Sequence, residues 1–145
     1  MKDTTITKDM VMPEIFQRRV KELGDEPCVF KKNNMGVFEE ISWNNMDAMV
    51  RSLGLYCISK GIKRGDKVAI FSPNRYEWWV ADMGSISIGA TTVPIYATNT
   101  AVEAQYILAN SDSRICFVGT REHLDKVLEV RKKLPQLLEI VVFDD

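Results

Sequence analysis

The second half of the chain alternates short apolar runs with longer segments of helical length, and this alternation restricts the possible folds more than any other feature. The apolar runs are Lys67–Phe71, Thr92–Ile95, Ile115–Val118 and Leu138–Phe143, and the segments between them are Tyr76–Gly89, Thr100–Asn110 and Arg121–Leu134. Parallel strands need crossover connections of this length, which are right-handed in nearly all proteins and place helices on both sheet faces. The sequence therefore predicts an α/β fold with a mostly parallel sheet and crossover helices.

The residues before this alternation predict a helix followed by a β-hairpin. Pro13 suits the first turn of a helix that continues to Leu23, and Gly24 supplies its end. Two short runs, Pro27–Lys31 and Val37–Ile41, then flank a turn-like segment at residues 33–36. This pattern of run, turn and run is typical of a hairpin.

A second helix is expected after the hairpin. Ser42 is placed to cap its start, and Gly61 to end it. Apolar residues recur in it at three-to-four spacing, which predicts one buried face, and they are Met46, Val50, Leu53 and Cys57. Further along, Thr100 and Glu103 form a capping box for a later helix.

These segments divide the chain into three parts. We expect an N-terminal tail at residues 1–12, a helix, hairpin and helix at 13–66, and a repeating β/α unit at 67–145. The last strand lies just before Asp144–Asp145, so we expect the sheet to be incomplete. The chain is then the partial, N-terminal portion of a larger domain.

Charge and composition restrict the class of protein. Nineteen Lys and Arg against twenty Asp and Glu give a net charge of -1, which leaves no positive excess for a nucleic-acid backbone. An apolar content of 46% with 27% charged residues is typical of a globular protein. No stretch reaches the roughly 18 apolar residues of a membrane span, and the N-terminus lacks a signal peptide core. We expect a cytoplasmic protein, with peripheral membrane association left open.

Most residues that could carry chemistry have a simpler structural interpretation. Cys28, Cys57 and Cys116 are odd in number, scattered and set among apolar neighbours, which predicts free buried thiols rather than a disulfide or zinc site. His123 is the only histidine and stands within a charged segment, which predicts a solvated helix face.

The paired carboxylates, Glu39–Glu40 and Asp144–Asp145, are expected to be surface charges, because neighbours in a strand point to opposite faces. The segment Gly84–Gly89 has two glycines but no lysine, so we expect close approach of a helix to the sheet rather than phosphate binding. Trp78–Trp79 could line an acyl pocket, although two core anchors are the favoured interpretation.

Polar turns follow three of the strands, where ligands bind in open α/β sheets. They are Ser72–Asn74, Ala97–Asn99 and Gly119–Thr120. The same composition is expected of any strand exit. No catalytic, cofactor-binding or metal-binding residue is therefore assigned.

Several segments in order resemble the opening of the AMP-forming acyl-CoA synthetases, the adenylate-forming superfamily that includes luciferase and peptide synthetase adenylation domains. These segments are Ser42–Trp43, Gly61–Ile70, Ser72–Trp79 and Gly89–Tyr96. The resemblance covers nearly the whole chain from about Glu14 onward. Four further segments are similar to the long-chain fatty acid branch, namely Ile95–Thr100, Tyr106–Ser111, Leu124–Leu128 and Ile140–Asp144.

The resemblance implies a two-step reaction in a parent enzyme. A fatty acid attacks the α-phosphate of ATP with Mg²⁺ to give an acyl-adenylate and pyrophosphate, and coenzyme A then displaces AMP. The family's Ser/Thr/Gly-rich loop ending in lysine, its aromatic-Gly-x-Thr-Glu motif, its ribose-binding aspartate and its C-terminal lysine do not occur among residues 1–145. The chain alone is therefore expected to be an inactive scaffold with no bound cofactor.

Two other classes stay open. One is a free-standing, flavodoxin-like module that binds a small molecule, although no phosphate loop is present. The other is a structural role in which the open edge of an unfinished sheet drives self-association.

Overall fold

The structure is a computed structural model that describes residues 5–33 and 35–144. The N-terminal part comprises α1 (Met12–Leu23), β1 (Pro27–Lys32), β2 (Phe38–Ser42) and α2 (Trp43–Ser59). The remainder comprises β3 (Lys67–Phe71), α3 (Tyr76–Ser87), β4 (Thr91–Ile95), α4 (Ala101–Asn110), β5 (Ser113–Val118), α5 (Arg121–Val130), a 3-10 turn (Arg131–Lys133) and β6 (Glu139–Val142). The order of elements predicted from the sequence is confirmed.

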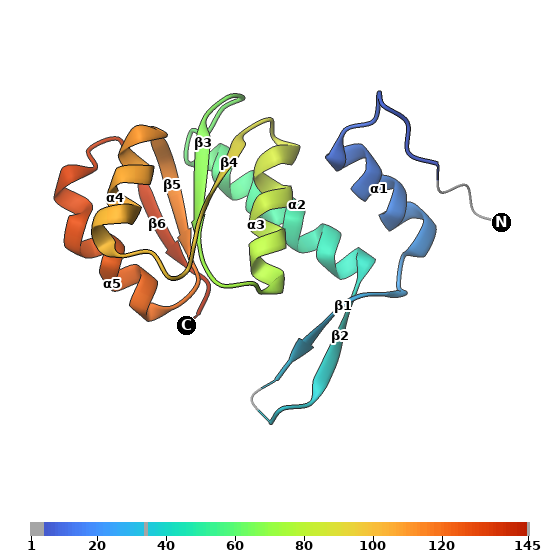
Figure 1. The fold of residues 1–145 in the computed structure, drawn as a ribbon. Helices are drawn as coiled ribbons and strands as arrows, with labels where there is room; N and C mark the ends of the chain where they lie inside the picture. The colour runs from blue at the N-terminus through green and yellow to red at the C-terminus, as the bar shows by residue number, and fades with distance from the viewer. Residues whose placement is uncertain (1–4, 34, 145) are drawn as a thin grey trace.

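Four strands form one parallel sheet in the order β4-β3-β5-β6, and β1 and β2 form a separate antiparallel hairpin. The hairpin extends away from the body of the molecule (Figure 1). Pro94 stands in β4, which is an edge strand and so tolerates a residue without an N–H. The α/β class is thus confirmed, while the division of the chain into three parts stays a prediction.

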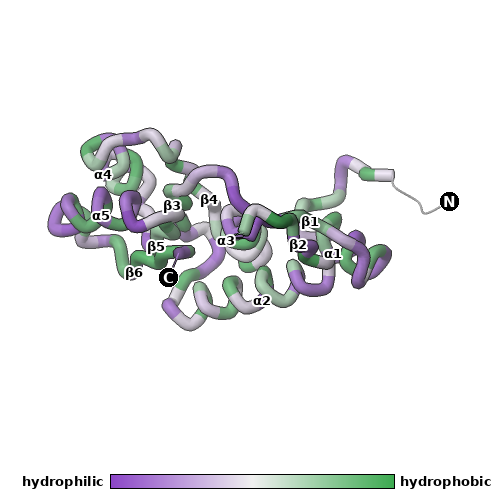
Figure 2. The backbone as a smooth tube through the Cα atoms, turned by 90° about the horizontal axis from the view of Figure 1, so that it is seen from below, coloured by the Kyte–Doolittle hydropathy of each residue, from purple (hydrophilic) through white to green (hydrophobic). Residues whose placement is uncertain are grey.

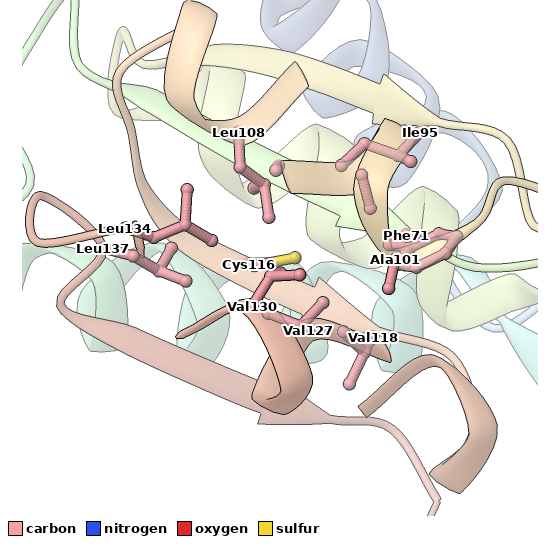
Figure 3. Close-up of a cluster of buried hydrophobic side chains, with 12 residues drawn as sticks. Phe71, Ile95, Ala101, Leu108, Cys116, Val118, Val127, Val130, Leu134 and Leu137 are labelled. Atoms are coloured by element: carbon pink, nitrogen blue, oxygen red, sulfur yellow. The ribbon is translucent and has the colours of Figure 1, made fainter. Parts of the chain in front are cut away.

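Successive residues of β3 point to opposite faces of the sheet, and both faces are covered. Ala69 and Phe71 face a cluster made with α4 and α5 (Figure 3). Val68 and Ile70 face a second cluster made with α2 and α3. The sheet therefore lies between two helical layers, as the hydropathy-coloured tube of Figure 2 also shows. Burial on both faces explains why these strands are apolar throughout.

A third cluster, which includes Phe16 of α1 and Ile41 of β2, joins α1 and the hairpin to the body. Phe16, Trp43 and Trp79 come from three different elements, and each pair of their ring centroids is 6.0 Å apart. Two of the three ring pairs are edge-to-face, a favoured arrangement for aromatic side chains. Trp79 is therefore a core anchor, as the sequence predicted.

The predicted helix caps are confirmed in atomic detail. The Ser42 hydroxyl accepts a hydrogen bond from the Asn45 N–H at 3.2 Å. The Thr100 hydroxyl accepts from the Glu103 N–H at 3.3 Å, and the Glu103 carboxylate accepts from the Thr100 N–H at 2.7 Å. These bonds satisfy donors that would otherwise lack partners at the starts of α2 and α4.

Two expectations differ from the structure. The helix expected to continue to Leu134 ends at Val130, and a short 3-10 turn precedes Pro135. The expectation that Gly84 lets a helix approach the sheet is wrong, because its near neighbours belong to α2: a Cβ there would lie 2.7 Å from Leu53 Cδ2 and 3.0 Å from the Val50 carbonyl oxygen. The glycine permits close contact between α2 and α3 instead.

Candidate functional site

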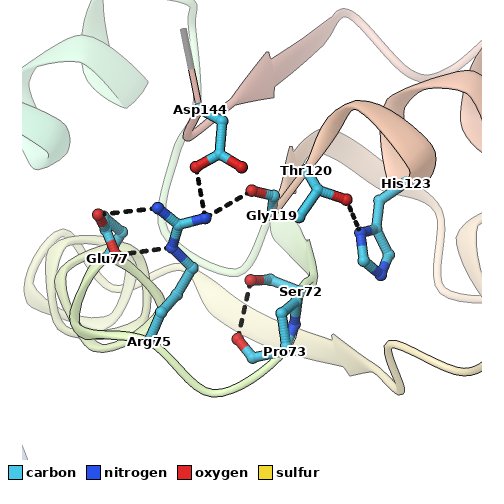
Figure 4. Close-up of polar contacts among 8 residues, drawn as sticks. All are labelled: Ser72, Pro73, Arg75, Glu77, Gly119, Thr120, His123 and Asp144. Carbon is cyan, nitrogen blue, oxygen red and sulfur yellow. Dashed lines mark hydrogen bonds and ion pairs between the residues drawn. The ribbon is translucent and has the colours of Figure 1, made fainter. Parts of the chain in front are cut away.

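The carboxyl ends of the four parallel strands meet at one edge of the sheet, where open α/β sheets bind ligands. The chain leaves β3 and returns through β4 on one side, whereas β5 lies on the other side of β3. The order of strands thus reverses between β3 and β5. Figure 4 shows the polar contacts at this reversal point.

The exits of β3 and β5 are in direct contact at the reversal point. The Gly119 N–H donates to the Phe71 carbonyl oxygen at 2.9 Å. A Cβ added to Gly119 would collide with the Ser72 hydroxyl and lie 2.8 Å from Pro73 Cδ. Glycine is required here for the close approach of the two exit loops, and their contact fills the space between them.

Arg75 connects three strand exits. Its guanidinium donates to both carboxylate oxygens of Glu77 at 2.7 and 3.0 Å, to the Gly119 carbonyl at 2.7 Å and to Asp144 at 2.7 Å. The same group lies 5.7 Å from the centroid of the Phe143 ring. A bidentate pair with further acceptors fixes the planar guanidinium in one orientation. Arg75 therefore holds the exits of β3, β5 and β6 together.

The electrostatics of this cluster follow from its geometry. The hydrogen bonds to Glu77 raise the pKa of Arg75, and Asp144 adds to that effect. Burial alone would raise the pKa of Glu77, but hydrogen bonds from Arg75 and from the backbone lower it below its ordinary value on balance. Arg75 and Glu77 are thus both charged at neutral pH. Asp144 is a paired charge at the surface, as expected for a surface carboxylate, while Asp145 lies outside the described residues.

The prediction that His123 lies on a solvated helix face is wrong. The side chain is only 5% exposed, and its ring packs edge-on against Phe71 with centroids 4.6 Å apart. Nδ1 lies 2.6 Å from the Thr120 hydroxyl, and Nε2 lies 3.1 Å from the Ala97 carbonyl oxygen. Its helical position explains the burial, because His123 shares a face with buried Val127 and Val130 at spacings of four and seven.

A pocket of about 460 Å³ lies beside this network, between the exits of β3 and β4. Its wall combines apolar side chains with the polar turns that follow the two strands: Ser72, Pro73, Asn74, Trp78, Pro94, Ile95, Tyr96, Ala97 and Thr98. The volume lies within the range of small-molecule sites. Trp78 also packs against the core cluster on the α2 and α3 side, so its core role is confirmed and it lines this pocket as well.

A larger open pocket of about 730 Å³ lies between the hairpin and the start of α3. Its charged side chains largely pair with one another: Lys31 lies 3.4 Å from Glu39, and Arg75 lies 2.7 Å from Glu77. These pairs weaken its attraction for an anionic ligand. Glu39 and its neighbour Glu40 are exposed on β2, as the sequence predicted.

The cysteines are free, and two of them are fully buried. Burial raises the pKa of Cys57 to about 11 and that of Cys116 to about 12, so both thiols stay protonated and inert. Burial also raises the pKa of the less enclosed Cys28 to about 11. Within residues 5–33 and 35–144, no three metal-ligating side chains come together.

The sequence predicted the edge of the sheet where ligands could bind, but not the contacts between residues that join the strand exits there. Arg75 and Asp144 are 69 positions apart, and His123 and Ala97 are 26 apart. No local pattern joins such pairs. The one available signal was the helical spacing of His123 with Val127 and Val130.

Known structures share this arrangement of strands and helices. The anthranilate CoA ligase AuaEII, solved in complex with anthranoyl-AMP, superposes with a TM-score of 0.85 at 22% identity, over 99% of this chain and 27% of that one. The two chains therefore share this α/β fold. None of the helices formed by the described residues is long and apolar enough to cross a membrane.

The sequence comparison gives the family. The chain belongs to the AMP-binding enzyme family, whose model matches residues 16–145. The long-chain-fatty-acid–CoA ligase FadD15 of Mycobacterium bovis is 33% identical over 119 residues, which are 81% of this chain and 20% of that protein. The long-chain-fatty-acid–CoA ligase ACSBG2 of Xenopus laevis is 29% identical over 143 residues, which are 99% of this chain and 19% of that protein. The chain spans about a fifth of the length of these relatives.

Proposed function

We propose that this chain is the N-terminal part of an AMP-forming long-chain fatty acid–CoA ligase. The observation that carries the proposal is that curated relatives with this activity in their names match 81% to 99% of the chain. In the proposed reaction, ATP and a fatty acid give an acyl-adenylate and pyrophosphate, and coenzyme A then gives acyl-CoA and AMP. The motif resemblance in Gly61–Ile70 and Ser72–Trp79 supports the same assignment.

The proposed role of this chain within the enzyme is that of a scaffold without catalytic residues. The described residues contain no cluster suited to Mg²⁺. The segment Gly84–Gly89 belongs to α3 and the turn that ends it, rather than to a loop between a strand and a helix. The proposal therefore assigns this chain no step with Mg²⁺ or with the phosphates of ATP.

The test compares the protein at its natural length with the 145-residue chain. We expect the former to release pyrophosphate only when ATP and a long-chain fatty acid are both present, and to form the thioester after coenzyme A is added. A matched series of fatty acids of decreasing length tests the substrate class. Activity that is kept with the long acids and lost with the short ones would support the long-chain assignment, whereas equal activity with short acids would contradict it. Pyrophosphate release by the 145-residue chain alone would contradict the scaffold role.

We also propose that the isolated chain self-associates. Large apolar side chains are exposed on the hairpin, with Phe30 at 58% and Phe38 at 64%, and Leu138 beside the edge strand β6 is exposed at 43%. Within the described residues, β6 pairs on one side only, with β5. Exposed strand edges and apolar patches promote association. A constant monomer mass in light scattering over a wide concentration range would contradict this proposal.

The location of the protein stays a prediction. We propose a cytoplasmic enzyme that contacts membranes at most peripherally. Fractionation of cells that express the protein at its natural length, with and without a high-salt wash of the membrane fraction, tests both parts. Resistance to the salt wash would contradict peripheral association.

A further inference from the structure

The buried ring of His123 makes polar contacts in addition to filling space in the core. It lies in the first turn of α5, its ring is buried against Phe71, and both of its nitrogens lie within hydrogen-bond distance of oxygen atoms. One of these, the Thr120 hydroxyl, lies at the exit of β5, and the other, the Ala97 carbonyl, lies at the exit of β4. The ring therefore joins two exit loops across the end of β3.

The two partners determine where the ring carries its proton. A backbone carbonyl only accepts hydrogen bonds, so Nε2 must carry the hydrogen that points at Ala97. A hydroxyl both donates and accepts, so the Thr120 O–H donates to a bare Nδ1 in the neutral ring. This arrangement satisfies both ring nitrogens in a site that is nearly closed to water.

Most groups around the ring are uncharged. The neighbouring charges on α5 are Glu122 and Lys126, which pair with each other at 2.7 Å, and the Lys126 ammonium lies 5.8 Å from the centroid of the Phe71 ring. The other groups that contact the ring, namely Phe71, Ala97 and Thr120, carry no charge.

The bond to Ala97 reaches the pocket described above. Ala97 and its neighbours Tyr96 and Thr98, which follow β4, line this pocket together with Trp78. Apart from the Asn99 N–H, which donates to Tyr96 at 2.9 Å within the same turn, few bonds restrain this loop. We infer that His123 is a positioning residue: its neutral Nε2–H tautomer binds the Ala97 carbonyl and fixes the pocket wall that follows β4.

The ring itself can be observed directly, because the chain contains one histidine. We expect a ¹⁵N-histidine sample at neutral pH to show the correlation pattern of a neutral ring protonated at Nε2. A Thr120→Val variant, which lacks the hydroxyl donor, should alter the Nδ1 resonance while Nε2 keeps its proton. A ring protonated at Nδ1 alone, or an imidazolium at neutral pH, would overturn the inference.

The effect on the loop is tested by amide hydrogen exchange at residues 96–99. We expect His123→Leu to accelerate exchange there about fivefold to tenfold, which corresponds to the net worth of one hydrogen bond. His123→Gln, whose amide can still donate to Ala97, should restore slow exchange. Val127→Ala is the matched control: Val127 is buried on the same helix face, and its truncation should lower global stability without selective loosening of this loop.

Each outcome of this experiment decides the matter. Unchanged exchange in His123→Leu would overturn the inference, as would equally fast exchange in His123→Gln and His123→Leu. If His123→Leu does not fold, the comparison of His123→Gln with Val127→Ala and the Thr120→Val spectrum carry the test. None of these measurements depends on ligase activity, so failure here and failure of the proposed function are distinguishable.

Discussion

Replacement of Gly119 by alanine tests whether the sheet is closed at the point where its strand order reverses. Gly119 is buried, and its φ is not in the left-handed region, so an alanine there suffers no backbone strain. The new methyl group would nevertheless collide with the Ser72 hydroxyl and approach Ser72 Cβ and Pro73 Cδ to 2.8 Å. The proline ring cannot rotate away, so the two exit loops must move apart.

The change in the free energy of unfolding that we expect for Gly119→Ala is the sum of two opposing effects. Overpacking of a close contact costs about 1–3 kcal/mol. Alanine also makes the unfolded chain less flexible than glycine does, which stabilises the folded protein by about 0.4–1 kcal/mol at a compatible position. We therefore expect a net loss of about 1–2 kcal/mol, which corresponds to a fall in Tm of about 3–8 °C for a chain of this size. Urea unfolding and thermal melting followed by circular dichroism measure both quantities.

A double variant controls for effects unrelated to the contact. Ser72→Ala removes the hydroxyl that the new methyl group meets first, so Gly119→Ala should cost less in that background, by about 0.5–1 kcal/mol. The contact with Pro73 remains, and the relief is therefore partial. A Gly119→Ala protein as stable as the original, or more stable, would refute the reasoning.

Three further outcomes are expected. Trp79→Ala should lower the free energy of unfolding by about 3–5 kcal/mol, since it removes a ring from the cluster that holds α1 and the hairpin, and an unchanged urea midpoint would contradict that packing. The pKa of Glu77 is lower in the folded state than in the unfolded state. The ionised carboxylate therefore stabilises the fold above the unfolded pKa, and this contribution is lost as pH falls through the folded pKa. Glu77→Gln should flatten the acid side of a plot of urea midpoint against pH. Cys57 and Cys116 should react with a thiol reagent only after unfolding, and rapid labelling of the native protein would show that they are accessible.

Local chemistry made much of the fold predictable from the sequence. The caps at Ser42 and Thr100 and the turn at Gly61 depend on neighbouring residues, so their positions can be read directly. The apolar runs from Lys67 onward were recognisable as strands because a sheet covered on both faces has no polar face. The end of α5 at Val130 was missed, because buried Leu134 follows Val130 at helical spacing, although the 3-10 turn Arg131–Lys133 lies between them.

Contacts across the sheet were not predictable in the same way. His123 was placed in solvent because its immediate neighbours are charged, although the residues one and two turns later face the core. Gly84 was assigned to the wrong neighbour, because a small residue in a helix does not indicate which element approaches it. The cluster around Arg75 depends on the strand order, which brings residues from three loops together only after the sheet has formed.

The two outer strands of the sheet differ in what they offer to a further strand. β4 contains Pro94, whose ring takes the place of one backbone donor, whereas all four residues of β6 carry an N–H. A further strand can therefore form an uninterrupted ladder with β6, and Arg75, bound to Asp144 just after that strand, holds this side in position. Because Pro94 removes one backbone donor from β4, the edge at β6 is the better partner for a further strand.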